Sequence, residues 1–309
     1  MAAVALISSF FDSEPDASDP ADATWRPASA PTTWQLLTDN LRGRLASMGR
    51  VVAHPIRIAH TGVNTIATSA RLLPEMNAAP RTSLNQRLRE ERHLGALHLD
   101  LETARVVAHA RGGKVNDVVL DIVAGGVREL LASRGELAEG LELIAAAPVS
   151  LRSSGTAREL GNVVGVFSMH LPIWEADTAR RLGLIASATA IAKAGQDRIN
   201  PANQVGMALF GWLDAAGFPI LDRQRMINFM VSNVPGPTRP LYVLGARIEN
   251  VMPFLPLFGN ETLTFVALSY CGRLNLVFMA DRAACPDVEI LVRGMKEAWQ
   301  DLAVIAAAA

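Results

Sequence analysis

This chain of 309 residues has few cysteines and almost no net charge. The two cysteines, Cys271 and Cys285, form no CxxC pair and suit a reducing cytosol. The formal net charge is only −1, which argues against the concentrated basic surface that nucleic-acid binding requires. No apolar run reaches transmembrane length, and Met1 to Phe11 lacks the basic start of a secretory signal. We therefore expect a cytoplasmic protein that binds no nucleic acid.

Several common catalytic motifs are also missing. There is no G-x-S-x-G turn to present the nucleophile of a Ser-His-Asp triad. There is no glycine-rich phosphate loop, and no His, Cys, Asp or Glu cluster has the spacing of a zinc site. No two of the six histidines are adjacent. We expect neither a metal nor a resident cofactor.

What the chain does contain is apolar material, since half of its residues are hydrophobic. The most regular stretch is a predicted helix that Asn116 caps, with Asp117 matching the helix dipole, and that runs to about Arg134. Two apolar rows with helical spacing predict that this helix is buried: Val118, Ile122, Gly126, Leu130, and Val119, Val123, Val127, Leu131. Gly125-Gly126 predicts close approach to another backbone, and Gly135 fits the position just past the last turn.

The rest of the second half has an α/β pattern. Alternating or buried-type apolar runs predict strands at 97–101, 143–148, 163–171, 228–234, 262–269 and 274–280. Cys271-Gly272 predicts a hairpin between the last two strands. Asp177 predicts the cap of one helix, and Pro286-Asp287 predicts the start of a final one.

The first third is different in composition. Met1 to Phe11 has one apolar helical face, and Asp12 to Pro31 is rich in Asp, Ser, Ala and Pro, which predicts a flexible linker. Trp34 to Met76 has an apolar stripe beside five arginines. Such a segment can lie on an anionic membrane surface, or it can be an exposed connecting helix with a solvated basic face.

Several short motifs resemble, in the same order, those of the bacterial wax ester synthase/diacylglycerol acyltransferase family. They begin with the "ND" motif and extend collinearly to near the C-terminus: Asn116-Asp117-Val118-Val119-Leu120, Pro148-Val149-Ser150-Leu151-Arg152, Gly161-Asn162, Ser232-Asn233-Val234-Pro235-Gly236-Pro237, Leu241-Tyr242, Gly245-Ala246 and Leu268-Ser269-Tyr270. Each is weak alone, and together they are specific.

The resemblance implies an α/β fold, with a mixed sheet flanked by helices. It would be the C-terminal half of a two-domain, CoA-dependent acyltransferase of the chloramphenicol acetyltransferase type. On that basis residues 1–12 are expected to be a remnant helix of the N-terminal half. Residues 13–95 would then be a linker with a basic amphipathic connection, and residues 96–309 the C-terminal domain.

The family chemistry is transfer of a fatty acyl group from acyl-CoA to an alcohol. In the family a His-His-x-x-x-Asp-Gly motif supplies the general base, and this chain has no such motif. Met1 to Phe11 resembles the helix that follows it, so we expect the chain to start just after that motif and to hold no catalytic residue. His98 and His170, which alternate into the core or a tunnel, are the substitutes considered, although no carboxylate has a spacing that would orient either.

Six residues are candidates for the substrate channel by resemblance: Asn116, Asp117, Ser232, Asn233, Pro235 and Gly236. The Asn116-Asp117 pair has two interpretations. It shapes the acyl-CoA site or braces the domain interface, or it is only a helix cap with a charge that matches the helix dipole. The Ser232 to Pro237 run lines the channel between the halves, or merely ends a strand.

Two kinds of function therefore remain in view. The first is an acyl-CoA-dependent O-acyltransferase that makes triacylglycerol or wax ester from diacylglycerol or a long-chain alcohol, with acyl-CoA as substrate and no cofactor. The second is a non-catalytic half-domain that binds lipid, membrane or a partner acyltransferase chain. A relative of condensation or polyketide-associated acyltransferases is a third, disfavoured by the ND and SNVPGP runs. Expected partners also include an N-terminal half chain, a second copy, and a membrane inner face or lipid-droplet surface.

Overall fold

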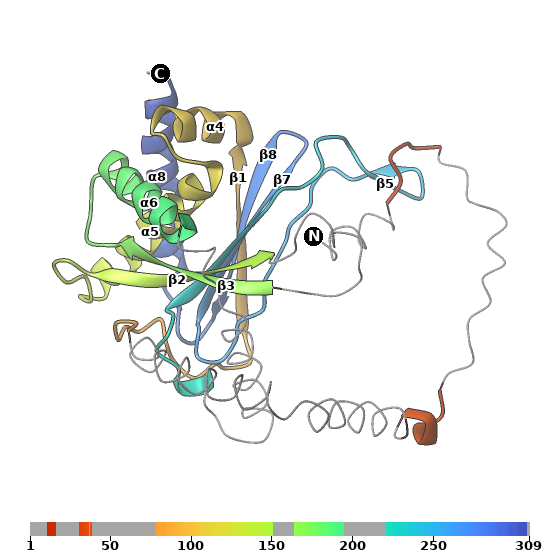
Figure 1. Ribbon diagram of the computed structural model, residues 1–309, viewed down its shortest axis with the longest axis horizontal. Coiled ribbons are helices and arrows are strands. Elements are labelled where there is room, and N and C mark those ends of the chain that lie inside the picture. Colours follow the sequence, from red (N-terminus) through yellow and green to blue (C-terminus); the bar gives the residue numbers. More distant parts are fainter. Residues whose placement is uncertain are drawn as a thin grey trace, which may run out of the picture.

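The computed structural model describes residues 11–16, 31–36, 38, 78–150, 164–194 and 221–307, with only the backbone at 148–150, 164–167 and 192–194. The predicted N-terminal helix, most of the linker and most of the basic segment lie outside the described residues, as do Arg152, Gly161 and Asn162 of the family motifs. Figure 1 shows the described part as a sheet with helices packed beside it.

Six strands form one mixed sheet in the order β1-β8-β7-β4-β2-β3 (Figure 1). Their bounds are β1 (Arg92–Asp100), β2 (Glu142–Ser150), β3 (Val164–Pro172), β4 (Phe229–Val234), β7 (Leu263–Tyr270) and β8 (Arg273–Asp281). β4 runs parallel to both of its neighbours, and the other neighbouring pairs are antiparallel. A separate hairpin joins β5 (Tyr242–Val243) to β6 (Ala246–Arg247), and a short 3-10 turn, η3, covers Leu221–Arg223.

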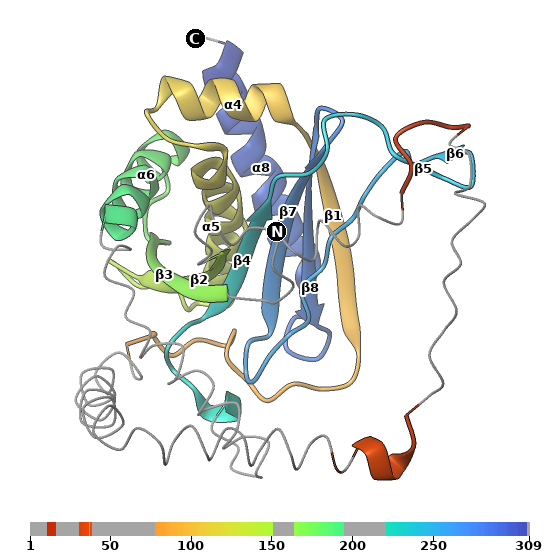
Figure 2. The ribbon, with the colours of Figure 1, turned by 45° about the vertical axis from the view of Figure 1, so that its right-hand side comes forward.

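Four helices cover one face of the sheet (Figures 1 and 2). They are α4 (Leu101–Ala110), α5 (Val115–Ser133), α6 (Thr178–Ala194) and α8 (Val288–Ala307). Alternate strand residues such as Leu274, Leu276 and Phe278 of β8 join these helices in the apolar core. The residues between them point to the opposite face, which we call the open face. The mixed sheet flanked by helices confirms the predicted fold class.

The α5–α8 crossing explains the glycine pair of the central helix. A Cβ atom on Gly126 would lie 2.8 Å from the carbonyl oxygen of Leu291 in α8. A Cβ atom on Gly294 of α8 would in turn lie 3.0 Å from the carbonyl oxygen of Gly125. The two backbones meet where neither helix has a side chain, so the predicted close approach is confirmed.

The start of the central helix differs from the prediction. The capping position is Lys114 and the helix begins at Val115, so Asn116 lies inside the first turn. Asp117 does the capping from within, because its Oδ2 atom accepts the backbone N–H of Lys114 at 2.8 Å. The remaining expectations for this helix are confirmed: Val119, Val123, Val127 and Leu131 are buried and Gly135 has a φ of 69°.

Sequence periodicity also missed α4. The alternation predicts that Leu101 belongs to the strand before it, but the chain turns into a helix there. Asp100 is the cap, and its Oδ1 atom accepts the backbone N–H of Thr103 at 2.6 Å. The last β1 residue thus starts a helix, and α4 then packs beside α8 above the end of the sheet (Figure 2).

Candidate functional site

An extended segment, residues 248–260, crosses the open face of the sheet; we call it the crossing segment. Figure 2 shows it running down along the sheet from hairpin β5–β6. Side chains of β7 and β8 donate hydrogen bonds to its carbonyl oxygens. These bonds join Tyr270 to Ile248 (2.8 Å), Asn275 to Val251 (3.0 Å) and Thr264 to Leu255 (2.7 Å). Because polar side chains of the sheet face satisfy its backbone, the segment is held against the sheet without being a strand of it.

The outer side of the crossing segment is apolar. Exposure alternates along it, and the outward side chains Met252, Phe254 and Phe258 are 54%, 66% and 50% exposed. Pro253 and Pro256 fix their own φ angles and favour the extended form that this alternation needs. We call Met252, Phe254 and Phe258 the apolar row. Large exposed apolar patches often mark binding sites, so this row is a candidate for one.

His98 of β1 lies beside the start of this segment and is exposed on the open face, not in the core; the alternative that it lines a tunnel stays a prediction. Its Nδ1 atom is 2.8 Å from Oδ1 of the buried Asn275, and Nδ2 of Asn275 donates to Oδ1 of Asn250 at 2.6 Å. Because Nδ2 of Asn275 is the donor there, its Oδ1 accepts, and Nδ1 of His98 carries the proton. In a neutral imidazole this leaves Nε2 as the unprotonated nitrogen.

His170 lies at the other side of the sheet, on β3, and is likewise exposed rather than buried. Its Nδ1 atom is 3.4 Å from Oε2 of Glu142 on β2. No carboxylate near His170 in the sequence has a spacing that would orient it, and Glu142 approaches only through antiparallel pairing, across 28 residues of sequence. Both side chains are at least half exposed, so the pair is a surface contact.

The ND motif holds helices together. Asp117 is buried, and while its Oδ2 atom caps α5, its Oδ1 atom accepts the hydroxyl of Thr189 in α6 at 2.8 Å. Asn116 is half-buried beside it. Through these contacts Asp117 links α5 to α6 on the helix-covered side of the sheet.

The SNVPGP run clamps the end of β4 onto the β7–β8 hairpin. The backbone N–H of Gly236 donates to Oγ of Ser269 at 3.1 Å, and the carbonyl of Pro237 accepts from Cys271. A Cβ atom on Gly236 would lie 2.1 Å from the carbonyl oxygen of Ser269, so only glycine fits. Ser232 is buried, whereas Asn233 is half-buried and Pro235 exposed. Within the described residues, no hydrogen bond joins this run to Asn116 or Asp117.

Two carboxyl groups in the interior have raised pKa values. Burial raises the pKa of Asp121 in α5 to about 6, although the Arg181 guanidinium opposes the shift through bonds of 2.8 and 3.2 Å. Burial alone raises the pKa of Glu261 to about 8, and its Oε2 atom has no hydrogen-bond partner among the described residues. The first is an ion pair between helices, and the second is a carboxyl group that is protonated near neutral pH.

The described residues contain no cluster of three His, Cys, Asp or Glu side chains that could hold a metal ion. No helix among them is long and apolar enough to cross a bilayer. The side chains that anchor the crossing segment by hydrogen bonds are amides and hydroxyls, and the His98 imidazole lies beside them.

Comparison with known proteins decides the family. The family model described as "Wax ester synthase/diacylglycerol acyltransferase catalytic domain" matches residues 1–119, and the "WS/DGAT C-terminal domain" model matches residues 160–303. The chain belongs to the wax ester synthase/diacylglycerol acyltransferase family. The family resemblance of its short motifs is confirmed.

Relatives agree with this assignment. A Mycobacterium tuberculosis protein named as a diacylglycerol O-acyltransferase is 27% identical over 96% of this chain and 60% of its own length. The O-acyltransferase WSD of Acinetobacter baylyi is 28% identical over 72% of this chain and 48% of its own length. The solved wax ester synthase/diacylglycerol acyltransferase of Marinobacter aquaeolei, at 22% identity and a TM-score of 0.65, shares the fold over 99% of this chain and 65% of that one. The chain therefore spans about half to two thirds of these proteins.

Sequence reasoning missed the crossing segment and its anchors. The signal for one anchor was present, because Asn275 interrupts an otherwise apolar strand. The alternation of Met252, Phe254 and Phe258 was also present, but without a neighbouring strand it could not be assigned to a face.

Proposed function

We propose that this chain is part of an acyl-CoA-dependent O-acyltransferase that esterifies diacylglycerol or a long-chain alcohol. The observation that carries the proposal is the match of both family models, in order, to residues 1–119 and 160–303. The products would be triacylglycerol or wax ester.

The apolar row supports a lipid substrate. Met252, Phe254 and Phe258 present hydrocarbon and aromatic surface in one line, on a segment anchored to the sheet at three places. A fatty acyl chain gains about 0.8 kcal/mol for each CH₂ group that it buries, so even a few contacts along such a row favour binding. In this proposal the row contributes to the wall of an acyl channel, and Ser232 and Asn233 lie towards its polar end.

The sequence of this chain lacks the pattern that supplies the general base in the family. The family motif with two adjacent histidines is absent, and a general base contributes about a hundred- to ten-thousand-fold to such a reaction. We therefore expect the isolated chain to transfer acyl groups at no appreciable rate. A chain that supplies the motif would complete the site.

A second candidate function is lipid or partner binding without catalysis. The exposed apolar row favours it, because this surface is available to bind even where no base is present. Attachment to a membrane through the basic segment of residues 34–76 stays a prediction, since most of that segment lies outside the described residues.

The test is an acyl-CoA assay with diacylglycerol and hexadecanol as acceptors, scored by thiol release and ester formation. One sample is this chain alone, and the other is a chimera in which this chain replaces the matching C-terminal part of the Acinetobacter O-acyltransferase. An active chimera beside an inactive isolated chain would support the proposal.

Ester formation by the isolated chain would contradict the expected inactivity, and His98→Gln and His170→Gln would then locate the base. A folded chimera without activity, combined with binding of a fluorescent acyl-CoA, would favour the non-catalytic function. The variant Phe254→Ser tests the apolar row and should weaken acyl-CoA binding. The control Ile191→Ser, at an exposed site on α6, should not.

A further inference from the structure

The outer edge of β1 lies open along the side of the sheet. β1 is the terminal strand in the sheet order, and among the described residues only β8 pairs with it. A long strand with an open edge offers a row of backbone donors and acceptors to another strand.

The register shows which backbone groups point outward. Just beyond the two ends of the pairing, the carbonyl of Glu91 accepts from Arg282 at 3.1 Å, and the N–H of Leu101 donates to Gly272 at 3.0 Å. In an antiparallel pair the bonded residues alternate, so odd-numbered residues of β1 bond to β8. The N–H and C=O groups of Leu94, Ala96 and His98 therefore face away from the sheet.

This edge has few of the features that block strand addition. Its nine residues contain no proline and no lysine, and the register with β8 is continuous, with no bulge. The side chain of Leu94 is exposed on the open face. The charged residues Arg92 and Asp100 stand at opposite ends of the strand.

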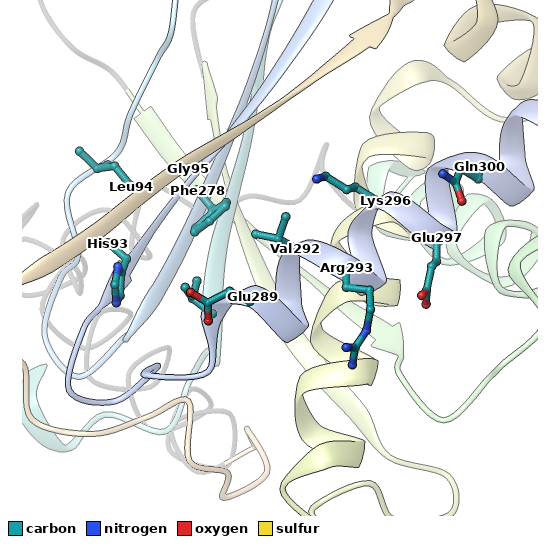
Figure 3. A pocket seen from close by; sticks show the side chains of 11 residues that line it. His93, Leu94, Gly95, Phe278, Glu289, Val292, Arg293, Lys296, Glu297 and Gln300 are labelled. Atoms are coloured by element: carbon teal, nitrogen blue, oxygen red, sulfur yellow. The ribbon is translucent and has the colours of Figure 1, made fainter.

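A groove accompanies the edge on the helix side (Figure 3). It has a volume of about 680 Å³ and lies between β1 and α8. Its floor is the ring of Phe278, which occupies the place where a side chain on Gly95 would stand, 2.4 Å from the ideal Cβ position. Figure 3 shows Lys296 and Arg293 on α8 together with Glu289 and Glu297, so the wall has charges of both signs.

We propose that the outer edge of β1 pairs antiparallel with β1 of a second copy of this chain, which joins the two six-stranded sheets into one. The pairing is centred on Ala96, opposite Ala96 of the copy. Leu94 then stands opposite His98, and Arg92 opposite Asp100, each of them twice by symmetry.

Charge favours this register through second contacts, because Arg92 already lies 3.4 Å from Asp281 and Asp100 caps α4. Moving the centre by one residue, to Gly95 or Leu97, separates Arg92 from Asp100, whereas the centre at Ala96 opposes the two charges at both ends. An α8 wall with both signs accepts an identical wall, but would repel part of a uniformly acidic or basic peptide. The groove beside the edge lets the copy bury more surface than a strand alone, as a stable interface requires.

The experiment compares the full chain with two edge variants in sedimentation velocity between low and high micromolar concentration. Ala96→Pro removes the two central hydrogen bonds of the dimer and none of the chain's own, since the Ala96 N–H faces outward. Leu94→Lys adds a charge to the edge. Each should weaken the dimer by about tenfold or more. The control Ile191→Lys makes the same change at an exposed site on α6, and should leave the dimer unchanged.

Hydrogen exchange provides a second measurement, because the amides of Leu94, Ala96 and His98 should become protected as concentration rises. A chain that stays monomeric throughout would overturn the proposal, even if those amides became protected on adding some other protein. A dimer that survives both edge variants would overturn it too, since another surface would then hold it. Leu94→Lys keeps the test valid if Ala96→Pro fails to fold, and neither result depends on acyltransferase activity.

Discussion

The effect of replacing Glu261 by glutamine on stability should become more favourable as the pH rises. The Glu261 residue is only 2% exposed, and burial raises its pKa from an ordinary 4.5 to about 8. Between these two values the folded state keeps a proton that the unfolded chain releases. The folded state then binds more protons, so its stability falls as pH rises through that interval. Glutamine has the same shape and no titratable proton, and removes this dependence.

The size of the effect follows from the pKa difference. A pKa change of 1 corresponds to about 1.4 kcal/mol, so the change from 4.5 to about 8 corresponds to at most about 5 kcal/mol at high pH. At pH 5 most of the cost is absent, and at pH 8 most of it is present. The difference in stabilisation between these two pH values should be about 3 to 4 kcal/mol. The amide nitrogen that Glu261→Gln introduces is itself buried, and it adds a cost of about 1 to 3 kcal/mol that does not vary with pH.

The assay is urea unfolding of wild type and Glu261→Gln at pH 5, 6, 7 and 8. Because the amide cost is constant, the change with pH is the quantity to measure rather than the stability at any single pH. Glu249→Gln is the matched control, since the Glu249 side chain is 76% exposed and its replacement should give a flat difference. A Glu261→Gln difference that is equally flat would refute the reasoning, and would mean that the Glu261 carboxyl group is ionised in the folded protein.

Three further substitutions test the packing. Val123→Asp buries an unpaired charge in α5 and should unfold the domain; a folded variant with an unchanged melting temperature would contradict the placement of this helix. Gly236→Ala should cost about 1 to 3 kcal/mol in thermal unfolding because backbone blocks its Cβ, whereas Gly183→Ala, with open space in α6, should be neutral or stabilising. Arg181→Leu should cost about 3 to 5 kcal/mol by leaving Asp121 unpaired, and adding Asp121→Leu should recover much of that loss; additive losses would count against the pair.

Local patterns in the sequence determined the elements of this protein. Two apolar rows are enough to predict a buried α5, because helical spacing brings residues three and four apart onto one face. Cys271-Gly272 is enough to predict the β7–β8 hairpin, because a tight two-residue turn needs positive φ angles, here 46° and 82°. The family motifs are local as well, which is why the family could be inferred before any fold was known.

The first residue of a helix was harder to predict, because a cap depends on one residue and several neighbouring residues can take that role. Asn116 and Asp117 both have capping chemistry, and the sequence could not tell that Asp117 would act from the third helical position. The strand-to-helix change at Asp100 was hidden because Leu101 continues the alternation of β1 while also opening α4.

Contacts between distant residues were decided only by the tertiary structure. The bonds among His98, Asn250 and Asn275 join three parts of the chain, and the Asp121–Arg181 pair links two helices 60 residues apart. The order of strands, which leaves β1 at the edge and the crossing segment over the open face, depends on pairing across long loops. Side-chain patterns show which face of an element is buried, but its partner is chosen by the packing of the whole chain.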